Sequence, residues 1–229
     1  MIALGLLIVN ICQMRSTEKA ASAAQDAAQT AKDTLVIAER PWITVGEMKA
    51  DGPLAFNPDG SVSINLSFRL KNIGHSIATD IYLRPQMMAQ IFGQSTFLDP
   101  INRQTEWCDK VRKERPERRF LKTLFPDDDT WESTSLQINK LEIDSAFGTY
   151  PNMLQQQGNF VAPIVYGCVN YQFPFSKEVH QTRFAFVISA INSKRPPSPH
   201  ESYPFVVGRN VPESGITIKS YYFGGTFAD

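Results

Sequence analysis

The sequence predicts a mainly β fold organised as a β-sandwich, and three observations over residues 62–85 support that prediction. Apolar and polar residues alternate from Val62 to Lys71, which gives a strand one dry and one solvated face. The next residues, from Asn72 to His75, tolerate a tight turn. β-branched and aromatic residues then resume an extended pattern, which we expect to end at Pro85 because proline lacks an amide hydrogen.

The first segment, residues 1–14, predicts a partial transmembrane or anchor helix. Ile2–Cys12 is almost wholly apolar, yet it is shorter than the roughly 20 residues that a membrane-spanning helix needs. A secretory signal would carry basic residues before this run, and a lipoprotein signal ending at Cys12 would carry small residues there. We therefore interpret the run as the C-terminal half of a transmembrane helix whose upstream turns precede this chain. Arg15 and Lys19 follow directly, which favours a cytoplasmic position for the rest of the protein.

Residues 15–40 predict a helical stalk, because they are rich in Ala, Gln, Glu and Lys. Small apolar residues recur every three or four positions and would form one seam along the helix. The seam indicates a short coiled coil that self-associates weakly, because alanine buries little area; the alternative is a solvated helix. The helix should stop before Pro41. The seam residues are Ala20, Ala24, Ala27, Ala31 and Leu35, with Ala38 following in step.

Residues 41–229 should form the sandwich, with a helical insertion at about 86–120. Gln86–Gln94 is expected to leave the sheet as helix or loop, and residues 173–181 are expected to form the loop of a hairpin. The other expected elements are strands at 42–45, 131–138, 160–173, 182–191 and 216–223 and a short helix at 140–147.

Residues 103–122 form a charged island in which Lys and Arg outnumber Asp and Glu. Trp107, Cys108 and Val111 share one helical face, so the favoured interpretation is an amphipathic helix packed on the sandwich with its charges in water. The alternative is a surface that binds anionic phospholipid headgroups or nucleic acid. The candidate contact residues of that surface are Arg112, Lys113, Arg118 and Arg119.

The remaining sequence gives no sign of enzymatic chemistry. The formal charge is balanced, 23 basic against 23 acidic residues, so no global field attracts nucleic acid. The three histidines and three cysteines lack metal-ligand or disulfide-framework spacing, and the aspartates from Asp127 to Asp129 lack the pattern of a calcium loop. Glu178, His180 and Arg183 are the one acid–base group to consider for a hydrolase, although surface hydrogen bonding is the favoured interpretation. We expect no catalytic, cofactor or metal site.

Several short motifs occur along the chain in a fixed order. They are Glu39-Arg-Pro-Trp-Ile43 after the Ala-rich helix, Leu70-Lys-Asn-x-Gly74, Ala78 with Asp80-Ile81, Leu124-x-Pro126-Asp127, Tyr166-Gly-Cys-Val-x-Tyr171 and His180-Gln-Thr-Arg-Phe184. Together they resemble a group of uncharacterised bacterial membrane-anchored proteins, with a sandwich similar to immunoglobulin-like adhesion or arrestin-type modules. The chain departs from that pattern at Ser76-Ile-Ala78, at Asp127 and at Pro174-Phe-Ser-Lys177, where Thr-Pro-Ala, glycine and Asp-x-Phe-Gly are usual.

The resemblance implies an immunoglobulin-like sandwich on a membrane anchor in the bacterial inner membrane, and it implies no known activity. From the residues and the resemblance together we expect a non-enzymatic, membrane-tethered binding or scaffold module. Its expected partners are the membrane, an unidentified protein and further copies of the chain through the stalk. Nucleic acid is not expected as a partner.

The charged island leads to a first prediction. If residues 103–122 bind anionic lipid or nucleic acid, changing Arg112, Lys113, Arg118 and Arg119 to Gln will abolish binding that weakens as salt rises. Vesicle co-sedimentation measures binding to lipid, and electrophoretic mobility shift measures binding to nucleic acid, each across a salt series. Binding that is unchanged in the Gln variant would eliminate the island as a contact surface.

Overall fold

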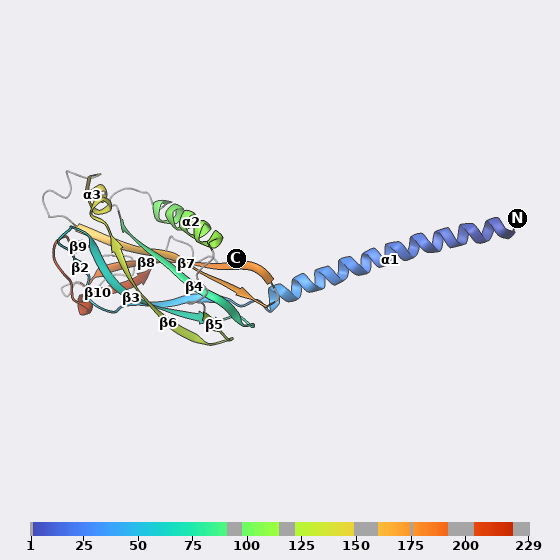
Figure 1. The fold of residues 1–229 in the computed structure, drawn as a ribbon, viewed down its shortest axis with the longest axis horizontal. Coiled ribbons are helices and arrows are strands. Elements are labelled where there is room, and N and C mark those ends of the chain that lie inside the picture. The colour runs from blue at the N-terminus through green and yellow to red at the C-terminus, as the bar shows by residue number, and fades with distance from the viewer. Residues whose placement is uncertain are drawn as a thin grey trace. The chain divides into compact units, whose positions relative to one another are not determined.

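The computed structural model describes residues 2–90, 98–114, 122–148, 160–174, 176–191 and 204–221 (Figure 1). The chain separates into two compact units, Met1–Arg40 and Pro41–Asp229. The described residues form helices α1 (Ile2–Ala38), α2 (Leu98–Lys113) and α3 (Lys140–Gly148), the 3-10 helix η2 (Glu213–Gly215) and strands β1 (Ile43–Ala50), β2 (Ala55–Phe56), β3 (Val62–Asn72), β4 (Ala78–Gln90), β5 (Lys122–Leu124), β6 (Asp129–Ile138), β7 (Phe160–Phe173), β8 (Ser176–Ala190), β9 (Phe205–Val206) and β10 (Ile216–Ser220).

The first unit is one continuous helix, α1, of 37 residues. Its alanine content favours the helix, and Pro41 prevents the helical conformation from continuing. All side chains from Gln13 to Thr34 are exposed. In the part of the chain that the structure describes, we find no helix with an apolar stretch long enough to cross a bilayer.

The second unit is mainly β and consists of two packed antiparallel sheets, so the prediction of a β-sandwich is confirmed at this level. In the first sheet β3 pairs with β1 and β2 on one side and with β6 on the other. In the second sheet the strand order is β10-β8-β7-β4-β5, with β9 also paired to β7. The predicted strands over 62–71, 131–138 and 160–173 and the helix at 140–147 are confirmed.

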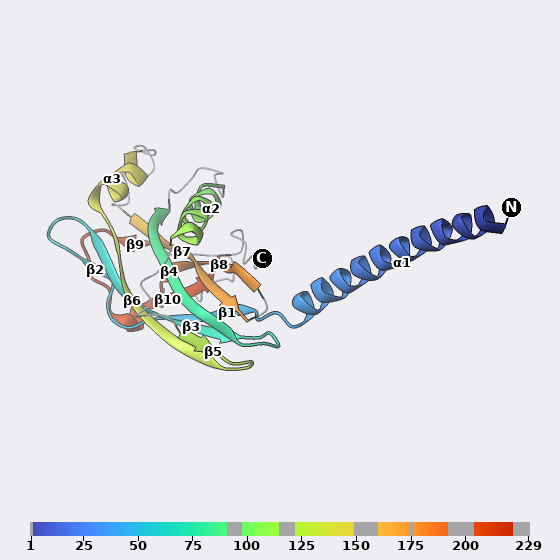
Figure 2. The same cartoon turned by 45° about the vertical axis from the view of Figure 1, so that its right-hand side comes forward.

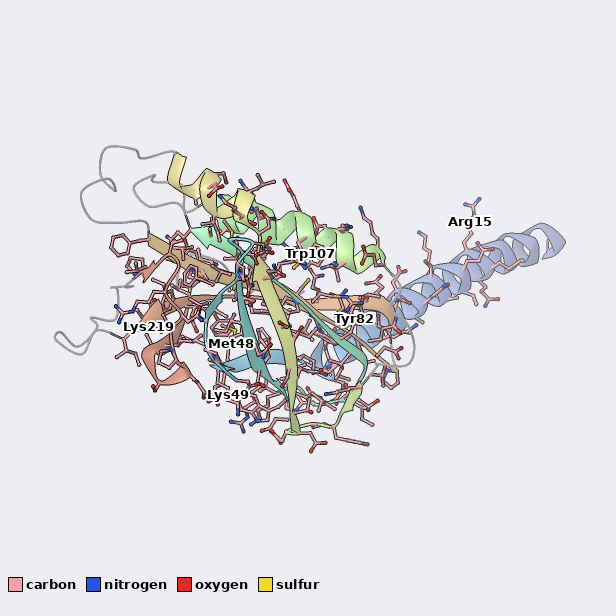
Figure 3. The ribbon with its side chains drawn as sticks, turned by 60° about the vertical axis from the view of Figure 1, so that its left-hand side comes forward. Arg15, Met48, Lys49, Tyr82, Trp107 and Lys219 are labelled. Carbon is pink, nitrogen blue, oxygen red and sulfur yellow. The ribbon has the colours of Figure 1, made fainter. Side chains whose placement is uncertain are left out.

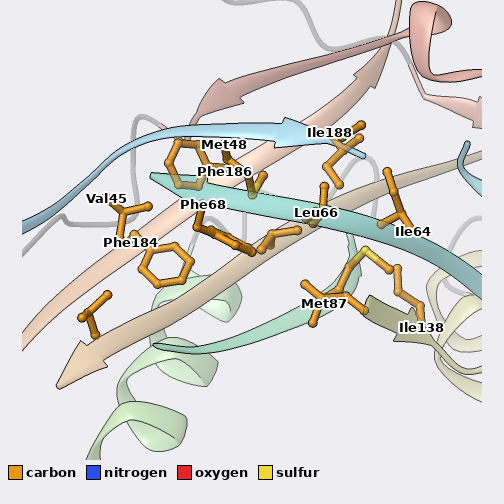
Figure 4. Packing of buried hydrophobic residues seen from close by; sticks show 14 of the residues in the cluster. Val45, Met48, Ile64, Leu66, Phe68, Met87, Ile138, Phe184, Phe186 and Ile188 are labelled. Carbon is orange, nitrogen blue, oxygen red and sulfur yellow. The ribbon is translucent and has the colours of Figure 1, made fainter. Parts of the chain in front are cut away.

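Alternation along the strands places the core between the two sheets. The inward residues of β3 are fully buried, and Phe68 packs on Phe184 of β8 with ring centroids 5.6 Å apart (Figure 4). Burying a phenylalanine of this kind stabilises the fold by roughly 1.5–3 kcal/mol. On the outer face of the second sheet, α2 covers β4, β7 and β8, as Figures 1 and 2 both show.

The two sheets are joined at corners rather than by a hairpin between β3 and β4. The β3–β4 corner, residues 73–77, carries the chain from the first sheet to the second, and the β5–β6 turn, residues 125–128, carries it back. Asn72 is buried between the two corners. Its side-chain Nδ2 donates to the carbonyl oxygens of Ser76 (2.8 Å) and Leu124 (3.2 Å), and its Oδ1 accepts from the amides of Gly74 (3.0 Å) and Trp42 (3.3 Å).

β4 does not end at Pro85, as the sequence predicted, but continues to Gln90. Pro85 lies opposite Gly167 of β7, and the pairing on the other side of β4, to β5, ends at Ile81. Within the described residues, where β5 begins at Lys122, the missing amide hydrogen therefore removes no bond to β5, and β4 tolerates proline there as an edge strand does. A Cβ on Gly167 would lie 2.4 Å from the Arg84 carbonyl oxygen, so only glycine permits this close approach.

The helical insertion is consequently shorter than the predicted 86–120. Residues 86–90 belong to β4. In the described part of the insertion the helix is α2, Leu98–Lys113. The predicted packing face of this helix is confirmed, because Cys108 and Val111 are buried and the Trp107 indole donates to the Arg84 carbonyl oxygen at 3.0 Å.

The predicted hairpin loop at 173–181 is wrong, because β8 already begins at Ser176, which pairs with Phe173. The polar residues of this stretch suggested a loop, but His180 lies opposite Tyr171 in the ladder. Its ring packs on Tyr171 and Phe173, with centroids 5.9 and 5.0 Å away. Aromatic contacts therefore compensate for a polar residue in a strand.

At the outer edge of the first sheet, β6 pairs only with β3 among the described residues. Glu132 lies between the outward-facing Trp131 and Ser133, so its side chain points inward, toward the second sheet. There its carboxylate pairs with Lys122 of β5, with a separation of 2.7 Å between Lys122 Nζ and Glu132 Oε1. The inner side of this edge is thus charged and only partly buried.

The Asn72 contacts predict a large cost for removing its side chain. Asn72→Ala leaves buried amides and carbonyls at both corners unpaired, so we expect a loss of about 3–5 kcal/mol in the free energy of unfolding. Asn65→Ala is the matched control, because Asn65 on the same strand is exposed and its replacement should change stability by about 0.5 kcal/mol or less. Urea denaturation followed by tryptophan fluorescence measures both. Equal stability of the two variants would refute the structural role of Asn72.

Candidate binding surface

The outer faces of the two sheets differ in what covers them. α2 packs on the second sheet, whereas the outward side chains of β1, β3 and β6 are largely exposed; we call these the open face. Figure 3 shows Lys49 of the open face and Trp107 of α2 on opposite sides of the sandwich. The open face comprises Glu47, Lys49, Asn65, Ser67, Arg69, Lys71, Asp129, Trp131, Ser133, Ser135 and Gln137.

Trp131 is the large apolar group of the open face. Its side chain is 38 % exposed, although tryptophan is usually well buried. The Lys49 ammonium lies 4.5 Å from the centroid of its ring, a cation–π contact across the sheet. Arg69, opposite Trp131 in the β3–β6 ladder, donates from Nε to Asp129 at 3.0 Å and lies 3.9 Å from Glu47. These contacts fix an indole among paired charges.

Hydrogen bonds hold the centre of the open face rigid. Ser67 is buried although it points outward, because it donates to the Asp51 carboxylate and lies 2.6 Å from the Ser133 hydroxyl. Asp51 itself follows β1 and its amide donates to the Asn65 carbonyl oxygen at 2.9 Å. The surface around Trp131 is therefore held in one arrangement by bonds within the sheet, the kind of preorganisation that lowers the entropy cost when a surface binds.

The covered side of the second sheet contains a polar network, formed by Gln104, Thr105 and Asp109 of α2 with Gln181 and Arg183 of β8. Gln104 Nε2 donates to the Phe184 carbonyl oxygen at 2.6 Å, and Gln181 Nε2 donates to the Cys108 carbonyl oxygen at 2.9 Å. Arg183 donates to Asp109 Oδ1 at 2.8 Å and to Thr105 Oγ1 at 3.1 Å. These bonds attach α2 to the sheet.

Tyr82 of β4 extends this network beneath α2. Asn170 Nδ2 donates to the Tyr82 hydroxyl at 2.6 Å, and Gln181 Nε2 donates to Asn170 Oδ1 at 2.8 Å. Burial of the phenol raises the pKa of Tyr82, since the anion would lose its hydration. Tyr82 therefore stays neutral, and its hydroxyl forms hydrogen bonds in the contact between α2 and the second sheet.

The candidate residues of the charged island do not form one free cationic surface within the described residues. Arg112 is half-buried and donates to Gln181 Oε1 at 3.4 Å, so it belongs to the network under α2. Lys113 is exposed at the end of α2. Arg118 and Arg119 lie outside the described residues. Of the other island cations, Arg103 pairs with Glu142 at 3.0 Å and Lys110 with Glu114 at 4.0 Å.

The residues considered for a hydrolase do not converge. His180 pairs with Tyr171 and Arg183 with Cys168, and residues three apart on a strand point to opposite faces. Glu178 is exposed near the start of β8.

No group of three or more His, Cys, Asp or Glu side chains within the described ranges could hold a metal ion. Asp129 pairs with Arg69, and Asp128 Oδ2 accepts from the Phe125 amide at 3.3 Å.

The seam residues Ala20, Ala24, Ala27 and Ala31 all lie exposed on α1. Leu35 lies on the same helix, but its side chain is outside the described ones. The side-chain hydrogen bonds described between Gln13 and Thr34 stay within the helix, for example Gln29 Nε2 to Asp33 Oδ1 at 2.8 Å. The seam is thus available along the helix for another surface.

Sequence reasoning did not find the open face. The alternation from Asp129 to Gln137, with Trp131 on the polar side, was the available signal, because an indole at a solvent-facing position of a strand is unusual. Its contacts with Lys49 depend on a pairing between segments distant in sequence, which alternation does not reveal.

Comparison with known proteins gives no likeness from which a function could be transferred. No protein family, no curated protein and no solved structure matches the chain. The open face and α1 are therefore interpreted from their own chemistry.

Proposed function

We propose that this chain is a non-enzymatic binding module, in which an immunoglobulin-like sandwich is carried on a membrane-tethered, self-associating helix. The sandwich contacts a partner protein through the open face. The observation that carries this proposal is the exposed Trp131, held by Lys49 and placed beside Arg69 on a preorganised sheet surface. Trp and Arg are the residue types that most often dominate the energy of protein interfaces.

The charges of the open face favour a protein as the partner. Arg69 is paired with Asp129 and lies near Glu47, and Lys49 is placed over the indole. Both signs are interspersed, so the face offers no continuous cationic stripe for a phosphate backbone. A protein surface of mixed charge with an apolar recess for the indole is the complement that fits.

Self-association is the second part of the proposal and rests on α1. An isolated helix in water is stabilised little by its own hydrogen bonds, and long helices normally gain stability by burying one face. α1 has 37 residues and a row of exposed alanines. A second copy of α1 packed on that row would supply the missing burial, and it would present several sandwiches together.

Membrane attachment is the third part and rests on the sequence of Ile2–Cys12, which is almost wholly apolar. Arg15 and Lys19 follow on the same helix, where they would meet the anionic headgroups of a cytoplasmic leaflet. This arrangement would hold the sandwich at the cytoplasmic face of a bacterial inner membrane.

Binding by the charged island to anionic lipid or nucleic acid is less well supported. The described island cations Arg103, Lys110 and Arg112 already contact other residues of the chain. Cations that are already paired or hydrogen-bonded contribute less to phosphate binding, because those contacts must be broken first.

Trp131→Ala tests the open face. We expect the variant to bind its partner at least about 30-fold more weakly, because truncating a central interface tryptophan costs about 2 kcal/mol or more. Partners are first captured by cross-linking to the full-length protein in its own cells, then purified and titrated by isothermal calorimetry. Trp42→Ala is the matched control, because Trp42 is 37 % exposed and directly precedes β1, a strand that is paired with β3 and not with β6.

Only a protein that the Trp131 variant loses and the Trp42 variant keeps supports the proposal. Thermal unfolding of both variants shows whether they remain folded. If every captured protein binds both variants equally, the open face is not the contact surface.

Charge placed on the seam tests self-association. Ala24→Glu with Ala31→Glu should convert the full-length protein from oligomer to monomer, since like charges would face each other across the helix contact. Ser22→Glu with Gln29→Glu adds the same charge on the opposite helix face and should leave the oligomer intact. Light scattering in detergent and then in buffer measures both. A monomeric wild-type protein, or equal association of the two variants, would refute the seam.

A further inference from the structure

Two buried cysteines share one small cluster between α2 and the second sheet. Cys108 belongs to α2 and Cys168 to β7, and both side chains are completely buried. They belong to one small cluster with Tyr82 and Val111, separate from the main core between the sheets. No other described cysteine belongs to this cluster, and hydrogen bonding to the Cys108 thiol is the first cause of the raised pKa of Cys168.

We propose that Cys108 and Cys168 are a modification site, a reversible disulfide that locks α2 onto the outer face of the second sheet. The pair lies at the centre of the helix–sheet contact, between the bonds of Gln104 and those of Tyr82. The oxidant is a small-molecule disulfide of the glutathione class. The disulfide would add a covalent link to the hydrogen bonds that attach α2, and this link would persist as long as conditions remain oxidising.

The reaction is two thiol–disulfide exchanges. The thiolate of one cysteine attacks a sulfur of glutathione disulfide, which forms a mixed disulfide and releases one glutathione thiolate. The thiolate of the second cysteine then attacks the protein sulfur of the mixed disulfide, which forms the bond between Cys108 and Cys168 and releases the second glutathione. The protein thiols lose two electrons, which reduce the glutathione disulfide, and their two protons end on the two glutathione thiols.

The surroundings make the exchange depend on movement of α2. The hydrogen bond from Cys108 and the burial of the site raise the pKa of the Cys168 thiol, while Arg183 and Arg112 oppose that rise. A protonated, buried thiol reacts slowly, so oxidant reaches the pair during folding or when α2 lifts from the sheet. Once α2 returns, both thiols are already adjacent and the second exchange is intramolecular.

The bond would have a large effect on stability, because it closes a loop of about 60 residues between α2 and β7. Closing a loop of that length restricts the unfolded chain strongly. The oxidised protein should also keep α2 in place under conditions that release the helix from the reduced protein.

The experiment uses the full chain with Cys12→Ser, which removes the third cysteine. The protein is refolded from denaturant in glutathione and glutathione disulfide, trapped by alkylation and mapped by mass spectrometry, and its Tm is compared with that of the reduced form. We expect a Cys108–Cys168 bond in most molecules and a Tm higher by roughly 10 °C. Addition of Cys168→Ser should leave only a glutathione adduct on Cys108 and remove the Tm difference.

Two outcomes would overturn the proposal. Both cysteines could remain as free thiols or glutathione adducts after refolding, which shows that they do not reach bonding geometry. Alternatively, the bond could form and lower Tm, which shows that it displaces α2 rather than locking it. The wild-type pair gives either answer without relying on a variant that must fold.

Discussion

The sandwich depends on one buried amide side chain. Each sheet is a separate ladder, and the chain passes between them at the β3–β4 corner and at the β5–β6 turn. Asn72 connects both, because its side chain bonds to Ser76 and Gly74 in one and to Leu124 beside the other. Its own backbone amide also donates to the Asp128 carbonyl oxygen at 3.0 Å. This set of bonds helps to fix the two sheets relative to each other, and their inner faces share one hydrophobic core.

The two outer faces of the sandwich use polar groups for opposite purposes. Under α2, Gln104, Gln181 and Arg183 are bonded to the helix and to sheet carbonyls, so they are committed to the fold. On the open face, Arg69 and Lys49 are held by neighbours but remain at the surface around Trp131. A buried network favours one position of α2, because any displacement leaves buried donors unpaired. The surface set costs little to expose and can interact with a partner.

The local sequence pattern correctly predicted strands whose two faces differ in polarity. The alternation at Val62–Lys71 predicted β3, and the turn residues after Asn72 predicted its end. It failed at Pro85, because a missing amide hydrogen matters only when a neighbouring strand needs it, and in the described residues the pairing of β4 with β5 extends no further than Ile81. It failed again at His180, whose place in β8 depends on the rings of Tyr171 and Phe173.

The candidate surface was less predictable than the fold. The charged island was visible in the sequence. The hydrogen bond that holds Arg112 in the network under α2 was not, because its acceptor, Gln181, lies 69 residues later. Trp131 was visible as a residue, but its role follows from the pairing of β6 with β3 and of β3 with β1, which brings Lys49 across the sheet. Contacts between distant segments are set by register, and register emerges only from the whole sandwich.

The charged inner side of β6 has a consequence for crowded molecules. Exposed strand edges from neighbouring copies can join into one continuous sheet, and that route leads to aggregation. If α1 self-associates as proposed, several sandwiches would meet at high local concentration. A strand added beside β6 would have to bury the carboxylate of Glu132, which now pairs with Lys122 at 2.7 Å. Removing that ion pair from water is costly, so copies can cluster while their sheets remain separate.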